Sequence, residues 1–327
     1  MDKSAVADAR KRTWHRIAAL FKIAVSLGLL WILFTTYDVR ESIERLAGLD
    51  PWWLVLASGL FLALIILGAV RWRIIITALG ESLPLGPALG ILVIGSFFNQ
   101  VLPSNLGGDA MRIWRLYRRG SALGRAVGSV MIDRVVALAG LSLLVLSTLP
   151  LAADQIGNNV LLVALWIFLA VVPVGLAILL WLDQALILFS RILPGRVIDS
   201  LGGLARDARA VLLNRRYGVV VLVCALANQV LLVMVVLALA RGLGLPAAFW
   251  DFIVLIPPVI LASVIPLSFA GWGVREAVMV AMLGTIGISA GDALALSVLF
   301  GLFVLAASLP GGVIWLITGN RLRSESG

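Results

Sequence analysis

The chain has 327 residues, of which 61% are hydrophobic and 13% charged, and its mean hydropathy is +1.08. This composition excludes an ordinary soluble domain and predicts an all-α polytopic membrane protein, with residues 1–327 forming one integral membrane domain. The net charge of +9 does not indicate nucleic-acid binding, because basic residues gather on the cytoplasmic loops of membrane proteins. With only Cys224 and His15, an internal disulfide is excluded, and we expect no metal site and no cofactor.

The basic N-terminal segment, 1–16, is predicted to lie in the cytoplasm, and its charge does not fit a cleaved signal peptide. The span that follows crosses outward to an acidic loop. The second span returns and ends inside at Arg71 and Arg73. Continuing in this way, we predict six full spans, at 17–36, 52–70, 126–149, 160–182, 219–240 and 294–317.

Two interrupted stretches, 103–112 and 266–276, stand in sequence that is otherwise apolar enough for a bilayer. Each begins with an aliphatic residue and a proline, passes a serine and two close glycines, and ends in an acid and an arginine. A helix does not run smoothly through such a stretch, so each copy is expected to break the helix and restart it. Broken helices at membrane depth are tolerated only where protein buries them or where they line a cavity. The sequence therefore predicts a candidate site that occurs twice.

The basic residues around the first stretch indicate its topology. If 85–102 crossed the membrane fully, the densest basic cluster of the chain would lie outside: Arg112, Arg115, Arg118, Arg119 and Arg125. The positive-inside bias instead favours a re-entrant hairpin over 85–120 that opens from the cytoplasm, with a short ordinary span as the alternative. A second hairpin over 250–290 then opens from outside, and the C-terminus lies inside. Two oppositely oriented broken hairpins form the inverted repeat that is typical of secondary transporters.

The connection 183–217 is the only sizeable soluble part. Its apolar residues recur at helical spacing over 197–212 among several arginines. This pattern predicts a cytoplasmic amphipathic helix on the anionic inner leaflet, and a solvated linker helix is the alternative.

The candidate substrate-binding residues gather at the two breaks and on the following span. Each restarted helix offers backbone N–H groups, and its glycines allow a ligand to approach closely. Arg112 and Arg275 lie near the start of these helices and need partners at membrane depth, where a bare arginine costs a few kcal/mol. The nearby carboxylates have one of two roles. Either they hold the arginines in position to bind a lipid phosphate, or they form closed ion pairs that lock the hairpins together. The full set is Asn99, Ser104, Gly107, Gly108, Asp109, Arg112, Asp133, Arg134, Ser268, Gly271, Gly273, Arg275 and Glu276.

At these residues the sequence resembles the flippase-like integral membrane family typified by the membrane domain of lysylphosphatidylglycerol synthase. The resemblance rests on 99–103, on Gly107, Gly108, Asp109 and Arg112, on Asp133 and Arg134, and on 266–273 with Arg275 and Glu276. Glutamate is common in that family where this chain has Asp109 and Asp133. The resemblance implies transbilayer movement of a lipid with a charged head group. Its aminoacyl-transferring members carry a large soluble domain after the last span; this chain ends at Gly327, so we expect no enzyme of that kind.

We therefore expect a flippase or transporter of the bacterial cytoplasmic (inner) membrane, which moves a phospholipid or a polyprenyl-phosphate-linked lipid. Its expected partners are membrane lipids with anionic head groups, and a homo-oligomer and a lipid-modifying enzyme are left open as further partners. One alternative is an integral-membrane transferase acting on a lipid-linked sugar, with Asp38, Glu41 or Glu44 as an acid at the outer surface. Another is a non-catalytic accessory subunit of a lipid-modifying enzyme, attached through the helix 197–212.

Overall fold

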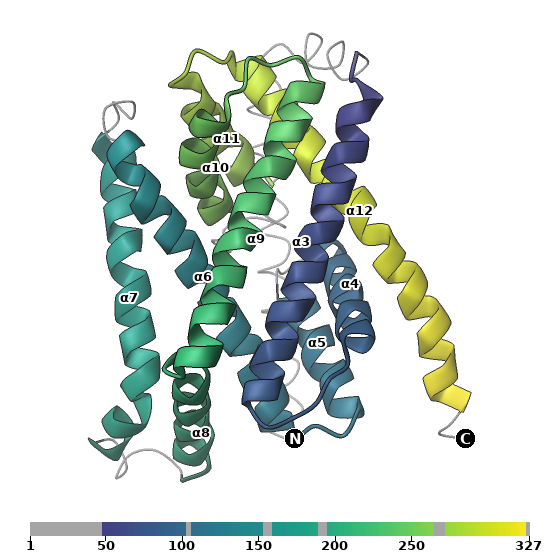
Figure 1. Ribbon diagram of the computed structural model, residues 1–327, viewed down its shortest axis with the longest axis vertical. Coiled ribbons are helices and arrows are strands. Elements are labelled where there is room, and N and C mark those ends of the chain that lie inside the picture. The colour runs from purple at the N-terminus through teal and green to yellow at the C-terminus, as the bar shows by residue number, and fades with distance from the viewer. Residues whose placement is uncertain (1–47, 103–105, 153–158, 189–194, 265–271, 325–327) are drawn as a thin grey trace, which may run out of the picture.

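The computed structural model describes residues 48–102, 106–152, 159–188, 195–264 and 272–324, and these residues form α-helices without a strand (Figure 1). The predicted all-α fold is thus confirmed for the described part of the chain. The helices are α3 (Pro51–Ala78), α4 (Leu85–Val101), α5 (Gly107–Arg118), α6 (Leu123–Ala152), α7 (Asn159–Leu188), α8 (Gly195–Leu212), α9 (Arg215–Gly242), α10 (Phe249–Val264), α11 (Val274–Gly284) and α12 (Ala290–Ser324).

Within the described part of the chain, four stretches are long and apolar enough to cross a membrane: α3, α9, Leu123–Thr148 of α6 and Ala290–Thr318 of α12. They correspond to four of the six predicted spans. The predicted span 160–182 lies within α7, and the predicted span 17–36 lies outside the described residues. The count of six therefore stays a prediction.

The helices are arranged around a pair formed by α3 and α9, which lie side by side through the middle of the molecule (Figure 1). The short helices α4 and α5 pack on each other near one end of this pair, while α10 and α11 pack on each other near the opposite end. Helix α12 runs diagonally past both short pairs, and α7 and α8 lie at the side. The short helices that flank the two interrupted stretches thus lie toward opposite ends of one bundle.

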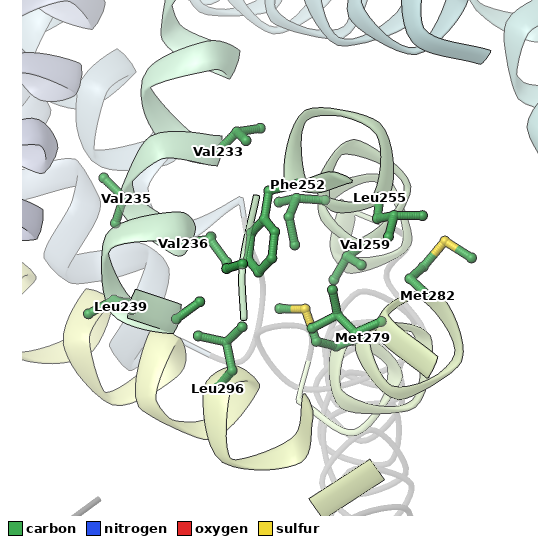
Figure 2. Packing of buried hydrophobic residues seen from close by; sticks show 14 of the residues in the cluster. Val233, Val235, Val236, Leu239, Phe252, Leu255, Val259, Met279, Met282 and Leu296 are labelled. Carbon is green, nitrogen blue, oxygen red and sulfur yellow. The ribbon is translucent and has the colours of Figure 1, made fainter. Parts of the chain in front are cut away.

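The largest apolar core joins α9, α10, α11 and α12. Phe252 of α10 is fully buried and its ring lies between Val236 of α9 and Met279 of α11, with Leu296 of α12 closing the cluster (Figure 2). Large side chains that interdigitate in this way favour one arrangement of the helices, because membrane helices associate mainly through packing.

Helix α3 is longer than the sequence predicts, and this changes the position of Arg71. The prediction ended the membrane span at Val70, with Arg71 at its cytoplasmic edge, and this membrane boundary stays a prediction. The helix continues through an apolar turn to Ala78 and ends just before Gly80, whose φ of 79° suits glycine. Arg71 is therefore a residue of the helix interior and is buried.

The predicted amphipathic helix of the 183–217 connection corresponds to α8. Part of its apolar face is buried against protein, since Ala205, Ala208 and Val211 are inaccessible to solvent. Arg209 forms an ion pair with Asp183 of α7, which ties the helix to its neighbour. Contact of α8 with the inner leaflet stays a prediction.

Candidate functional site

The first break between helices, from α4 to α5, is held by an asparagine and a glycine. Helix α4 ends at Val101, two residues before Pro103, as is usual ahead of a proline. At the restart, the Gly108 N–H donates to Asn99 Oδ1 at 2.8 Å. A Cβ on Gly108 would lie 2.2 Å from the carbonyl oxygen of Gly95, so only glycine fits this contact. The break thereby brings the first turn of α5 directly onto α4.

This contact places α5 so that its charged residues meet those of α3 and α6. Asp133 of α6 accepts hydrogen bonds from two arginines: Arg71 Nε donates to Oδ1 at 2.8 Å, and Arg112 Nη2 donates to Oδ2 at 2.7 Å. Asp109 of α5 accepts two bonds from Arg134, Nε to Oδ2 at 2.7 Å and Nη2 to Oδ1 at 2.9 Å. Arg112 also lies 3.5 Å from Asp109. We call these five residues the central charge cluster.

The central charge cluster carries one positive charge in excess, since three guanidinium groups face two carboxylates. Four of its members are buried, whereas the side chain of Arg134 is 44% exposed. The Arg112 guanidinium also lies over the ring of the fully buried Trp72, 4.5 Å from its centroid. Such a cation–π contact stabilises a desolvated cation without neutralising its charge.

A pocket of about 250 Å³ opens beside the central charge cluster. Four cluster residues line it: Arg71, Arg112, Asp133 and Arg134. Neutral polar groups come from α4 and α9, among them Asn99 and Asn228, and apolar side chains complete the wall. Two buried polar atoms, Arg112 Nε and Asn228 Oδ1, have no hydrogen-bond partner among the described residues. The pocket therefore offers an anion three guanidinium groups and one carboxylate in its lining, beside the amides of Asn99 and Asn228.

The second break, before α11, is organised differently. Gly273 has a φ of 89° and its N–H donates to the carboxylate of Glu276, which caps the restarted helix. The same carboxylate pairs with Arg275 and accepts from Ser297 Oγ of α12 at 3.1 Å. Arg275 lies against the rings of Trp272 and Phe300. These groups form a closed and electrically neutral cluster.

The structure brings together the predicted residues of each break and shows where the prediction was incomplete. At the first break the closest ion pairs join different helices. Asp109 and Arg112, which are neighbours within α5, lie 3.5 Å apart, farther than the 2.7 Å between Asp109 and Arg134. The N–H groups of Gly108 and Gly273, expected to be open to a ligand, both donate within the protein. Gly107 is also tightly packed, because a Cβ there would lie 2.6 Å from the side chain of Leu102.

Sequence reasoning missed three residues. Arg71 was predicted at the cytoplasmic end of a span, while Asn228 and Ser297 are polar residues in apolar runs and give no signal of their own. One signal would have found Arg71: it is an arginine with apolar residues within one helical turn on both of its sides. Some predicted residues lie outside the described part of the chain: Ser104, Ser268 and Gly271 of the breaks, and Asp38, Glu41 and Glu44 of the transferase alternative.

The apolar spanning helices and the buried charges they enclose define a multi-pass helical membrane protein. Its sequence matches the family described as lysylphosphatidylglycerol synthase TM region over residues 19–311, and the chain belongs to this family. The match confirms the resemblance carried by the two interrupted stretches, both of which it covers. A comparison with curated proteins gives no match.

Proposed function

We propose that the protein is a lipid flippase or transporter of the bacterial cytoplasmic membrane, and that the phosphate of its lipid binds in the pocket beside the central charge cluster. The observation that carries this proposal is the excess positive charge of that cluster next to an open pocket. Among the described residues of the cluster, three guanidinium groups share two carboxylates, and cationic side chains at membrane depth are costly unless they are well paired, so an anion that enters the pocket is stabilised. Arginine suits a phosphate in particular, since its planar fork of donors matches two phosphate oxygens.

The lengths of the helices beside the breaks support a re-entrant arrangement. With 17 and 12 residues, α4 and α5 are about 26 and 18 Å long; with 16 and 11 residues, α10 and α11 are about 24 and 17 Å long. Each is shorter than the roughly 30 Å of a bilayer's hydrocarbon core. In this proposal, α4–α5 opens to the cytoplasm and α10–α11 to the outside, and movement of one pair against the other exposes the lipid to each side in turn.

The two breaks have different roles in this proposal. At the first, the carboxylates of Asp109 and Asp133 keep the arginines in place while the pocket is empty. At the second, Arg275 pairs with Glu276 through one carboxylate oxygen, and in this proposal the paired arrangement is the closed state of that break. A phosphate that displaces the Glu276 carboxylate from Arg275 would open it, which couples lipid binding to the change of access.

The proposal is tested by lipid movement in vesicles that contain the purified full chain. The probes are a fluorescently labelled phosphatidylglycerol, a labelled short polyprenyl phosphate and a labelled glucosylceramide, which carries no phosphate. Bleaching of the outer leaflet reports how much label has crossed. We expect the chain to move at least one phosphate-bearing probe faster than protein-free vesicles do, and to leave the glucosylceramide rate unchanged.

The variant Arg134→Gln removes the excess charge from the central charge cluster at its exposed member. Loss of a charge-assisted hydrogen bond worth about 1.5–3 kcal/mol predicts roughly 10- to 100-fold weaker phosphate binding. The matched control is Arg118→Gln on the same hairpin, an exposed arginine away from the pocket, which should keep the wild-type rate. Equal rates in both variants would show that the cluster only locks the hairpins, and no movement of either phosphate probe would overturn the transport proposal.

A further inference from the structure

A second hollow lies on the other side of α6, between α6, α7 and the start of α9. It measures about 420 Å³, which is within the size range of ligand-binding pockets. Helix α6 contributes a stripe at helical spacing, Val135, Ala139, Ser142, Leu143 and Leu146, and α7 contributes another, Leu169, Val172, Pro173, Leu176 and Leu180. We call this hollow the α6–α7 groove.

The groove is separate from the pocket of the proposed function. On α6 the pocket is lined by Asp133, Arg134 and Ala137, whereas the groove is lined by the stripe that begins at Val135. At 100° per residue these sets face opposite sides of the helix. A ligand in the groove therefore does not contact the central charge cluster.

The lining of the groove is suited to a hydrocarbon chain. Apart from the hydroxyl of Ser142 it presents only apolar side chains and one glycine, and that hydroxyl already donates to the carbonyl oxygen of Leu138. The walls come from Leu123–Thr148 of α6 and from Val172–Gln184 of α7, both of which are apolar enough for the membrane interior. At that depth the neighbouring molecules are lipid tails, so an apolar hollow takes up a tail rather than water.

One end of the groove carries positive charge. There its lining is Leu212, Leu213, Gly218 and Val219, at the junction of α8 and α9. Arg215 and Arg216 belong to the same junction, and both are exposed. Neither forms an ion pair with a described residue, while Asn214 between them and the groove caps α9 through the N–H groups of Arg216 and Tyr217. Two exposed guanidinium groups, which lie in the sequence between the lining residues Leu213 and Gly218, complement an anionic head group attached to an acyl chain.

We propose that the α6–α7 groove is a binding site for an anionic phospholipid, distinct from the transport pocket, with one acyl chain in the groove and the phosphate on Arg215 and Arg216. The bound lipid fills the space between the peripheral helix α7 and the body of the bundle. Because α7 packs chiefly on α8 and only lightly on α6, this lipid is part of what holds α7 in place.

The test uses the full chain in vesicles with a photoreactive group near the middle of a phospholipid acyl chain. One probe is a phosphatidylglycerol and the other a phosphatidylcholine, and mass spectrometry of peptides locates the adducts. We expect phosphatidylglycerol adducts to concentrate on the α6 and α7 stripes. Each basic residue at a membrane surface attracts anionic lipid head groups. The double variant Arg215→Gln/Arg216→Gln should therefore reduce the phosphatidylglycerol adducts about tenfold and leave the phosphatidylcholine adducts unchanged.

Matched variants separate the groove from general contact with lipid. Arg241→Gln, an exposed arginine at the opposite end of α9, should leave the adduct pattern as in the wild type. Ala139→Phe fills the groove and should lower the adducts, whereas Val223→Phe, on the exposed side of α9, should not. Adducts spread evenly over all exposed helices would overturn the proposal. So would photo-leucine crosslinks from Leu176 to another copy of the chain or to 17–36, since protein would then cover the groove.

Discussion

Replacing Asp133 by asparagine tests the central charge cluster most directly, because this carboxylate alone joins Arg71 to Arg112. All three side chains are buried. The substitution keeps the shape of the side chain but raises the excess charge from one to two. Breaking a buried ion pair by removing one partner costs about 3–5 kcal/mol, since a charge is left uncompensated. We expect the free energy of unfolding, measured by steric trapping in bicelles, to fall by about that amount.

Second-site variants show whether the loss arises from this particular pairing. Arg71→Gln or Arg112→Gln in the Asp133→Asn background restores the original excess charge and removes an unpaired guanidinium, so each should recover a substantial part of the lost stability. Arg134→Gln restores the same total charge but takes away the partner of Asp109, and it should recover little. Equal recovery by all three would show that only the net charge matters. An unchanged stability of Asp133→Asn itself would refute the reasoning.

Two further predictions concern the packing of α4 and the pH response of α8. Gly108→Ala forces α5 away from α4, because the new Cβ would lie 2.2 Å from a backbone oxygen, and should cost about 1–3 kcal/mol of unfolding free energy. Gly90→Ala in α4 meets no atom within 4 Å and should instead add about 0.5–1 kcal/mol, so equal effects of the two substitutions in the same measurement would contradict the close contact. Burial raises the pKa of the Asp207 carboxyl, against the opposing effect of Arg125 and Arg206. The folded state then favours the protonated acid and loses stability as pH rises through that pKa, so the Tm of Asp207→Asn should exceed that of the wild type by more at pH 7 than at pH 4; a constant difference would contradict this.

Much of the fold follows from local features of the sequence. Long apolar runs predict spanning helices because an unpaired backbone group in lipid is too costly for any other structure. Proline and glycine mark the ends of α4 and the starts of α5 and α11, since these residues act through the backbone itself. Local sequence thus determines that these segments are helices, where the two breaks fall and which residues carry the family resemblance.

The partners across helices are determined only by the tertiary structure. Helices such as α3 and α9 are apolar on all sides, so no hydrophobic stripe in the sequence indicates which face meets which neighbour. For this reason the sequence placed Arg71 at a membrane edge, whereas packing of α3 on α6 brings it 2.8 Å from Asp133, 62 positions away. Packing between helices also places the charged pocket beside the first break. At the second break it brings Ser297 of α12 into contact with Arg275 and Glu276. The sequence by itself determined which charged residues adjoin the two breaks, and the arrangement of the helices decided which of those charges are neutralised.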